Sequence, residues 1–193
     1  MITDDVKTDQ RLLNLAGFKA GKVDGVVGPR TQAAYDRWAA AAPDLSGVDE
    51  RSARNLATLL PEVALEVRDW LVWQAVPYAK KLGYVVKIIC GTRSWAEQEE
   101  LYAKGRTVPG ARVTNAKAGA SWHNYGVAFD IGLFTAKGDY VTDDGVYRRL
   151  VELAGVPEGF EWGGGWKSFC DVPHFQWVAV YKSLASLKVK SNG

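Results

Sequence analysis

Apolar residues follow two spacings along this chain, one typical of helices and one typical of strands. The predicted helices cover residues 10–18, a segment that begins at Thr31, and residues 50–60, 62–82, 94–105 and 145–154. The predicted strands cover residues 84–90, 127–133 and 175–181. The part of the chain that carries the strands is therefore predicted to have an α+β fold.

Several residues mark where these elements begin or end. Ser94 and Glu97 have the spacing of a capping box, which predicts the start of a helix. Thr31 is a predicted N-cap, and Gly155 is predicted to stop the helix that precedes it. Pro77 predicts a kink or an end in the longest helix, because proline has no backbone N–H to donate.

An alanine-rich stretch that runs into Pro43, Ser46 and Gly47 predicts a linker. The linker divides the chain into residues 1–45, a small helical unit, and residues 46–193, a larger α+β region. A unit as short as the first lies below the size at which a hydrophobic core is easily stable alone. We therefore expect two domains of unequal size.

The chain contains only two histidines, His123 and His174, and each lies a few residues from an aspartate. Two imidazoles and one carboxylate are the usual ligands of a catalytic zinc ion, which keeps a fourth position for water. Asp130 shares a strand face with small residues, as a crowded metal site requires. Asp171, three residues before His174, is placed to act as a general base. The sequence therefore predicts a zinc hydrolase.

Other interpretations of these residues are weaker. A histidine taken alone is more often a core or surface residue, and the pairing with aspartates is what favours a metal site. The chain lacks the HExxH motif of helix-based zinc proteases and the G-x-S-x-G motif of serine hydrolases. Cys170 as a fourth ligand would close the site and prevent catalysis. Cys90 and Cys170 form no CxxC motif, and we expect both to be reduced thiols.

Charge and hydropathy limit the partners of the protein. The formal net charge of +2 is too small to favour nucleic acid as a ligand. The longest uncharged run, residues 70–79, is too short to span a bilayer, so we expect no membrane insertion. Residues 1–7 are acidic and lack an apolar segment, so we expect no signal peptide.

Two ordered motifs carry a family resemblance. Residues 121–130 have the pattern S-x-H-x-x-G-x-A-x-D, and residues 171–176 have the pattern D-x-P-H-F-Q. Together they resemble the zinc-dependent D-Ala-D-Ala carboxypeptidase and L-alanyl-D-glutamate endopeptidase family, which includes phage endolysins. The segments that are similar to the endopeptidase branch are residues 91–94, 105–110 and 161–166.

The resemblance implies a small antiparallel sheet, flanked by helices, that holds the metal. It implies that His123, Asp130 and His174 bind zinc, and that Asp171 takes a proton from water and passes it to the leaving amine. Arg93 would stabilise the oxyanion or hold the substrate, by charge and two-pronged hydrogen bonding.

Four further residues are candidate substrate contacts. Ser121 would bind a carboxylate or the backbone of the substrate, although a serine here is also typical of a turn. Gln98 is a candidate of the same kind. Trp162 and Trp166 would line the cleft, although aromatic residues at this density are more often part of a core.

Residues 4–41 resemble the small helical peptidoglycan-binding module found on many wall hydrolases. The resemblance rests on the pattern L-L-N-x-x-G-F, followed by V-D-G-V-x-G-P-x-T. It implies that this segment binds the bacterial cell wall. The alternative is a docking segment that has no affinity for glycan.

The expected function is a monomeric peptidoglycan endopeptidase of the endolysin type, which cuts the L-Ala–D-Glu bond of the stem peptide. The resemblance implies release from the host cytoplasm to the wall through a holin. One alternative is a D-Ala-D-Ala carboxypeptidase or endopeptidase on the same zinc site. Another is a non-catalytic wall-binding protein with a structural metal, but such a protein would need neither Asp171 nor Arg93.

Overall fold

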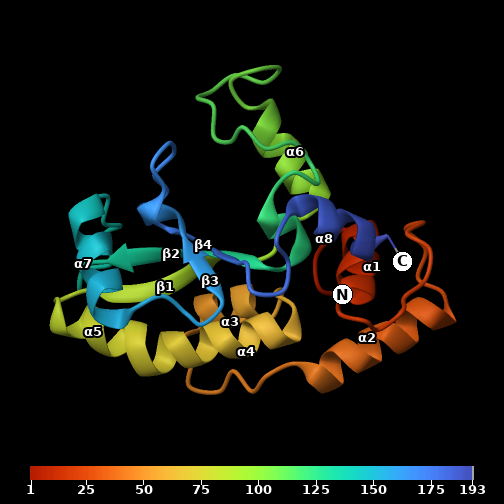
Figure 1. Cartoon of the computed structure of the whole chain (residues 1–193), viewed down its shortest axis with the longest axis horizontal. Helices are drawn as coiled ribbons and strands as arrows, with labels where there is room; N and C mark the ends of the chain where they lie inside the picture. The colour runs from red at the N-terminus through yellow and green to blue at the C-terminus, as the bar shows by residue number, and fades with distance from the viewer. Residues whose placement is uncertain (193) are drawn as a thin grey trace.

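The computed structural model describes residues 1–192 and contains one antiparallel sheet with helices packed against it (Figure 1). The sheet has the strand order β1-β2-β4-β3. Its strands are β1 (Val85–Cys90), β2 (Ala128–Phe134), β4 (His174–Trp177) and β3 (Phe160–Trp162). The predicted α+β class is therefore confirmed, and β3 is a strand that the sequence did not predict.

The register of the sheet brings polar residues of three strands into one row. Asp130 in the central strand β2 pairs with Cys90 of β1 on one side and with His174 of β4 on the other. The register of β1 shifts between Ile88 and Cys90, which marks a β-bulge. Bulges re-aim side chains beside functional sites. The row therefore positions one of the predicted ligands directly beside another.

A nearly continuous run of helix covers the other face of the sheet (Figure 1). It consists of α3 (Glu50–Leu56), α4 (Pro61–Trp70), the π-helical turn η1 (Leu71–Ala75) and α5 (Val76–Lys81). The helix predicted over residues 50–60 ends four residues early, at Leu56, and the chain continues in turns in which Thr58 N and Leu59 N donate to the carbonyl oxygens three residues before them. In the longer helix, the π-helical turn comes just before Pro77 and the chain remains helical through it.

An aromatic cluster anchors the two central strands on these helices. The rings of Phe129 and Phe175 stack with their centroids 4.9 Å apart, and Trp70 lies 5.4 Å from Phe175. Both phenylalanines are fully buried. Because side chains alternate along a strand, burying Phe129 and Phe175 turns their neighbours Asp130 and His174 to the opposite face.

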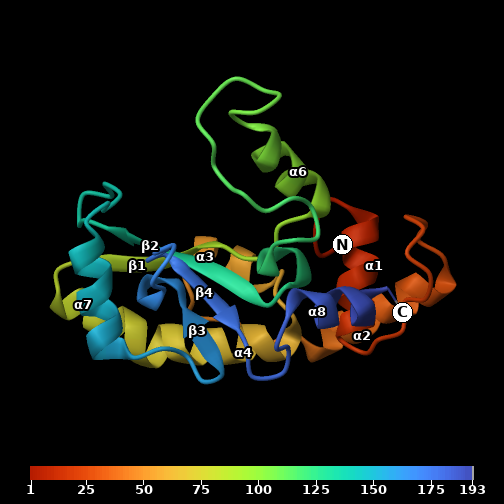
Figure 2. The ribbon, with the colours of Figure 1, turned by 45° about the horizontal axis from the view of Figure 1, so that its top comes forward.

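The helix α6 (Trp95–Ala103) and the loop after it project from the body as a lobe (Figure 2). The predicted capping box is present, since Ser94 Oγ accepts from Glu97 N and Ser94 N donates to the Glu97 carboxylate. The chain returns through the 3₁₀ turn η2 (Trp122–Tyr125) into β2. The lobe thus overhangs the row of polar residues on the sheet.

The N-terminal and C-terminal helices gather at one end of the molecule (Figure 2). They are α1 (Val6–Leu15), α2 (Pro29–Ala41) and α8 (Leu184–Ser191). The prediction that Thr31 caps the second helix is wrong. The helix begins at Pro29, whose fixed φ angle suits the first helical position, and Gly28 is the N-cap.

The N-terminal segment shares its packing with the rest of the chain. Leu12 and Leu13 are fully buried in the same hydrophobic cluster as the sheet. The backbone N–H of Trp95 donates to Thr8 Oγ1 over 3.1 Å. The Arg11 guanidinium lies 3.8 Å from the centre of the Trp95 indole ring. A Cβ added at Gly126, which ends η2 with φ +67°, would lie 3.2 Å from a Leu12 methyl. Helix α1 therefore supports the turn that carries His123.

The remaining elements close the two ends of the sheet. Helix α7 (Asp144–Ala154) stops at Gly155, which has φ +69° as its predicted role requires. The strand predicted over residues 175–181 ends at Trp177, because the next two N–H groups both donate to Gly159 O and do not continue the strand pairing. Within residues 1–192, none of the helices combines the length and apolar character needed to cross a bilayer.

Candidate active site

Three side-chain atoms from separate segments meet above the sheet. His123 Nε2 lies 3.2 Å from Asp130 Oδ1, and His174 Nδ1 lies 3.1 Å from the same oxygen. The two imidazole nitrogens lie 3.2 Å from each other. His123 comes from η2, Asp130 from β2 and His174 from β4. The three atoms therefore form a nearly equilateral triangle.

The outer nitrogen of each imidazole has its own hydrogen-bond partner. His123 Nδ1 lies 2.8 Å from the carbonyl oxygen of Gly91, to which it donates. His174 Nε2 lies 3.2 Å from Gln176 Oε1, to which it donates. In the neutral imidazoles these bonds leave the inner nitrogens with lone pairs that face the Asp130 carboxylate.

The lone pairs of the two inner imidazole nitrogens and of the Asp130 carboxylate repel one another at these distances, and a cation between them would remove the repulsion. Burial disfavours the charge of Asp130, but His123 and His174 outweigh burial and lower the pKa of this carboxyl. Burial likewise opposes the charge of His123, yet Asp130 raises the pKa of His123 well above its ordinary value. Bonds of about 2.0 Å at tetrahedral angles separate two zinc ligands by about 3.3 Å. The spacing of the triangle fits such an ion.

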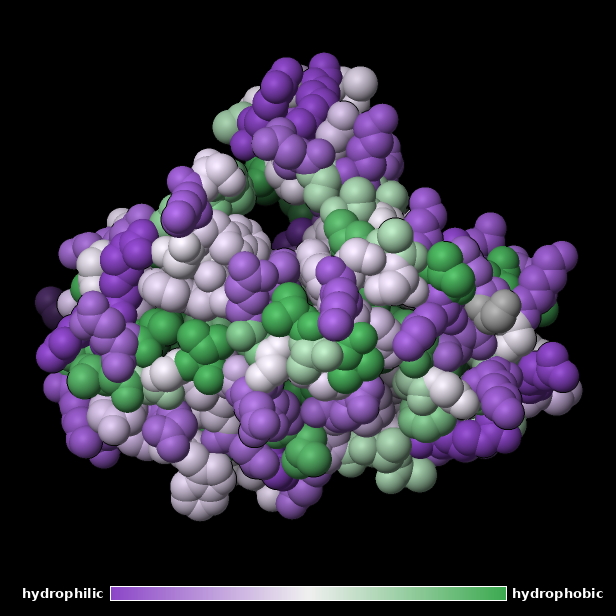
Figure 3. Space-filling model, in the orientation of Figure 1, coloured by the Kyte–Doolittle hydropathy of each residue, from purple (hydrophilic) through white to green (hydrophobic). Residues whose placement is uncertain are grey.

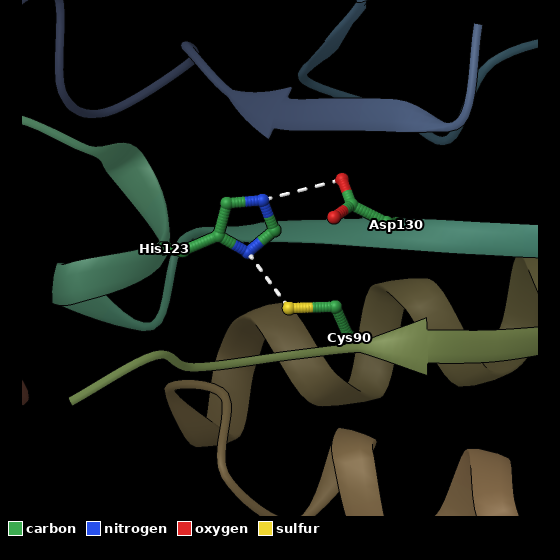
Figure 4. A group of neighbouring side chains, drawn as sticks. All are labelled: Cys90, His123 and Asp130. Atoms are coloured by element: carbon green, nitrogen blue, oxygen red, sulfur yellow. Dashed lines mark hydrogen bonds and ion pairs between the residues drawn. The ribbon is translucent and has the colours of Figure 1, made fainter. Parts of the chain in front are cut away.

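Cys90 adds a fourth polar atom on the far side of His123. Figure 4 shows the His123 ring between the two groups, with one nitrogen toward Asp130 and the other toward Cys90 Sγ. The sulfur lies 3.7 Å from His123 Nδ1, the nitrogen that also donates to Gly91. Cys90, His123 and Asp130 are thus close enough to be a donor group of their own. The triangle with His174 is the better site, because all its lone pairs converge on one point.

The triangle lies on the floor of an open cleft with a volume of about 840 Å³. Figure 3 shows the hollow between the lobe and the body of the molecule. The predicted site residues that line the cleft are Arg93, Ser121, His123, Asp130, Asp171 and His174. Its outer wall is formed by Leu101, Phe169 and residues 112–116. A peptide chain therefore has access to the triangle from solvent.

Asp171 stands at the edge of the triangle. It is half-buried, and its carbonyl oxygen accepts from the His174 N–H over 3.2 Å. Burial raises the pKa of the Asp171 carboxyl, and the charge of Asp130 raises it further. A carboxyl that is shifted toward neutrality beside a candidate metal site is suited to exchange protons.

Arg93 lies on the other side of Asp130. One guanidinium nitrogen, Nη2, lies 3.9 Å from Asp130 Oδ2, and Nη1 donates to Gln98 Oε1 over 2.9 Å. The Arg93 N–H donates to the carbonyl oxygen of His123 over 3.0 Å. The backbone and the side chain of Arg93 are thus both fixed relative to the triangle, and its charge faces the cleft.

Gln98 and Trp162 lie away from the cleft surface. Gln98 is fully buried and donates to Ala116 O over 2.7 Å, so it connects Arg93 to the loop of the lobe. The Trp162 indole N–H donates to Val172 O over 2.8 Å, and its ring lies 6.4 Å from that of Phe175 in the core. The expectation that these two side chains contact substrate therefore has no support in their placement.

Trp166 belongs to a chain of contacts that begins at His174. Its ring lies 5.5 Å from the His174 ring, and its indole N–H donates to Glu161 Oε1 over 2.7 Å. The other oxygen of Glu161 accepts from Gln176 Nε2 over 3.3 Å. Gln176 in turn accepts from His174. The chain therefore fixes the ring orientation of His174, as outer partners of metal ligands do.

Sequence reasoning missed the roles of Gln176, Glu161 and Gly91. The alternation of His174 and Gln176 along one strand was a usable signal, because it places both side chains on the same face. No local signal could identify Glu161, since β3 reaches Gln176 only through sheet pairing. Gly91 acts through its backbone oxygen, and a backbone contact leaves no mark in residue type. Cys170 remains outside the site, where its sulfur accepts from Arg148 over 3.0 Å.

All three residues of the triangle lie in a part of the chain that is similar to known proteins. Residues 114–177 match the sequence profile of a family described as D-alanyl-D-alanine carboxypeptidase. The chain is also similar to the peptidoglycan L-alanyl-D-glutamate endopeptidase CwlK of Bacillus subtilis, with 43% identity over 109 residues. That alignment covers 52% of this chain and 65% of CwlK. The chain thus spans less than two thirds of the length of this curated relative.

Two solved structures are similar in part. One is the L-Ala D-Glu endopeptidase ChiX of Serratia marcescens, with a TM-score of 0.45 and 25% identity over 72% of this chain and 100% of that one. The other is the vancomycin-resistance D,D-pentapeptidase VanY in complex with Zn(II), with a TM-score of 0.42 and 18% identity over 70% of this chain and 79% of that one. Over these regions the chain is therefore similar to D-alanyl-D-alanine carboxypeptidases and to an L-alanyl-D-glutamate endopeptidase.

Proposed function

We propose that the protein is a zinc-dependent endopeptidase that hydrolyses the L-Ala–D-Glu bond in the stem peptide of peptidoglycan. The observation that carries the proposal is the triangle of His123, Asp130 and His174, whose lone pairs converge on one point of an open cleft. The 43% identity with CwlK supports the choice of substrate.

His123, Asp130 and His174 would hold the zinc ion through the three atoms that face one another. When bound, zinc would lower the pKa of a water molecule and polarise the carbonyl group of the substrate. The hydrogen bonds from His123 to Gly91 and from His174 to Gln176 would keep both imidazoles in the ligating tautomer.

Asp171 and Arg93 line the same cleft as the triangle and would both act on the substrate. Asp171 would accept the proton of the attacking water and deliver it to the amine that leaves, a role that its raised pKa favours. Arg93 would donate to the oxygen of the carbonyl group under attack, because its guanidinium is charged and held in place by Gln98. Ser121 lines the same cleft and would bind the peptide backbone of the substrate.

The runner-up is a D-Ala-D-Ala carboxypeptidase that uses the same residues. The description of the matching family profile favours it. The name of CwlK, together with the resemblance of residues 105–110 and 161–166 to the endopeptidase branch, favours the L-Ala–D-Glu bond. Both reactions use the same triangle, so the bond that is cut must be identified from the products.

The biological setting belongs to the same proposal. We propose that the chain is a monomeric endolysin of a bacteriophage, and that it reaches the wall from the host cytoplasm after a holin opens the membrane. The resemblance of the sequence to a family that includes phage endolysins supports this setting. The resemblance of residues 4–41 to a wall-binding module supports a role of the N-terminal unit in locating the substrate.

Mass spectrometry of digested peptidoglycan tests the proposed bond. Cleavage at L-Ala–D-Glu exposes new D-Glu amino termini and leaves L-Ala carboxyl ends on the glycan. Release of free D-Ala without new D-Glu termini would establish the carboxypeptidase instead. A parallel digest with the Asp171→Asn variant controls for a contaminating peptidase, since this variant should release neither product.

A further inference from the structure

Helices α1, α2 and α8 meet at the opposite end of the molecule from α7 (Figure 2). Residues of these three helices and of the loop after α1 line a second cleft. We call it the basic cleft, and it is defined by Phe18, Lys19, Gly21, Arg30, Arg37 and Lys190. Its volume is about 1020 Å³, and no acidic residue lines it within the described part of the chain. It is separate from the cleft above the triangle, with which it shares no lining residue.

The four cations of the basic cleft lack acidic partners. Lys19, Arg30, Arg37 and Lys190 form no ion pair with a carboxylate among residues 1–192. Their mutual repulsion is unfavourable, although the net charge of the whole chain is only +2. Positive charge that is concentrated in one cleft attracts anions and raises their local concentration.

The cleft is a built feature and not a chance gathering of mobile side chains. Asn14 forms two hydrogen bonds with Gly21. Its Oδ1 accepts from the Gly21 N–H, and its Nδ2 donates to the Gly21 carbonyl oxygen. Arg37 donates to Phe18 O over 2.8 Å. The stem of Arg30 lies so close to Gly21 that a Cβ there would be 2.9 Å from Arg30 Cδ. The loop that forms the cleft is thus held at both of its ends.

Lys19 provides an independent sign of function in the same loop. It has φ +57°, and it is the one non-glycine residue with a left-handed backbone among the described residues. A lysine in this conformation is strained relative to glycine or asparagine, and such strain clusters at binding sites. The strained residue is one of the four cations that line the cleft.

We infer that the basic cleft binds a strand of a wall polymer with a phosphodiester backbone. A phosphodiester carries a fixed negative charge in every repeat, so one strand in the cleft would offer several anionic groups to the four cations that line it. Arginine forms two-pronged hydrogen bonds with phosphate. Phe18 and Ala33 offer apolar surface for the carbon atoms between phosphates. The inference rests on the proposed function, because that function brings the chain to the cell wall.

The test compares the whole zinc-loaded protein with two triple variants of equal charge. One variant carries Lys19→Gln, Arg30→Gln and Lys190→Gln, and Arg37 is retained because it supports the loop. The matched control carries Lys80→Gln, Lys137→Gln and Arg149→Gln, all exposed and outside the basic cleft. Binding is measured by cosedimentation on ice with two preparations of sacculi. One preparation carries the phosphodiester polymer, and the other has had it removed with hydrofluoric acid.

The inference predicts that the cleft variant binds polymer-bearing sacculi about tenfold or more weakly than the wild type and the control variant. The wild type should lose the same affinity on extracted sacculi, and added salt should weaken only the polymer-dependent part. Equal loss in both variants, or undiminished binding to extracted sacculi, would overturn the inference. Equally strong competition by DNA at the same phosphate concentration would also overturn the assignment to a wall polymer.

Hydrolysis of a soluble stem peptide is measured in parallel for the same three proteins. All three should cleave it at the same rate, because none of the substituted residues lines the cleft above the triangle. If even the wild type fails to cleave any stem peptide, the proposed function fails, whereas the binding result stands on its own.

Discussion

His123 Nε2 lies 3.2 Å from His174 Nδ1, and both atoms face the carboxylate of Asp130. Because the outer nitrogens of the two rings donate elsewhere, the inner nitrogens cannot both be satisfied without a cation between them. In the absence of metal, a proton held on His123 serves this purpose, as the raised pKa of His123 indicates. A bound metal ion would displace that proton.

The affinity for zinc should therefore depend on pH. A histidine binds metal only when it is deprotonated, and the pKa of His123 in the metal-free protein is raised above the ordinary value of about 6.5. Affinity should fall as the pH decreases through this raised pKa, and the fall should begin above the pH expected for a free histidine. Competition titrations with a chromogenic chelator between roughly pH 6 and pH 9 measure this. An affinity that does not change over this range would contradict the assignment.

Substitution should separate the two aspartates by function. Asp171→Asn should retain zinc and lose turnover on the order of 10²-fold or more, because it removes the proton acceptor but none of the ligands. Asp130→Asn should lose zinc together with activity, since it removes the negative charge on which both imidazoles converge.

Metal analysis and stem-peptide hydrolysis on the same samples distinguish these outcomes. A zinc-free Asp171→Asn variant alongside a zinc-loaded Asp130→Asn variant would show that the two roles are reversed. Thermal unfolding of both variants controls for loss of the fold.

Gln176→Leu should weaken zinc binding on the order of 10-fold to 100-fold, although Gln176 would not touch the metal. The substitution removes the acceptor of the His174 Nε2–H and frees the ring to adopt the tautomer that cannot bind. Gln74→Leu is the matched control, because Gln74 is exposed in η1 and far from the triangle in the fold. Isothermal titration with zinc measures the difference, and equal affinities in the two variants would refute the positioning role.

The structure brings together the three residues that the sequence predicted as ligands, whereas the sequence did not predict most of their surroundings. His123, Asp130 and His174 could be named because ligand chemistry restricts residue type, and because alternation along a strand fixes which side chains share a face. The burial of Phe129 beside Asp130 follows from the same alternation.

The sequence could not predict surroundings that depend on contacts between residues distant in sequence. Gln98 was a candidate substrate contact because of its polar side chain, yet it is buried and donates to Ala116 O in the loop of the lobe. Trp162 and Glu161 take opposite roles on the same short strand, because one faces the core and the other faces Gln176. Nor could the sequence show that Leu12 packs against the turn that carries His123.

This packing predicts that the N-terminal unit contributes to stability. Leu12→Ala should reduce the free energy of unfolding by about 2–5 kcal/mol, because it leaves a cavity beside Gly126. Leu65→Ala, at a leucine that is 45% exposed, should cost much less. A chain that begins at Val48 should be destabilised further, since it removes all three buried leucines of α1. Urea unfolding measures all three, and a shortened chain as stable as the whole protein would contradict the shared core.

The most direct test of the metallopeptidase assignment is a zinc titration followed by product analysis. Protein stripped of metal should release no D-Glu amino termini from peptidoglycan, and cleavage should return in proportion to added zinc up to about one equivalent per chain. His123→Ala should neither bind zinc nor recover. Full cleavage by protein that contains no metal, or recovery of His123→Ala to the wild-type rate, would contradict the account.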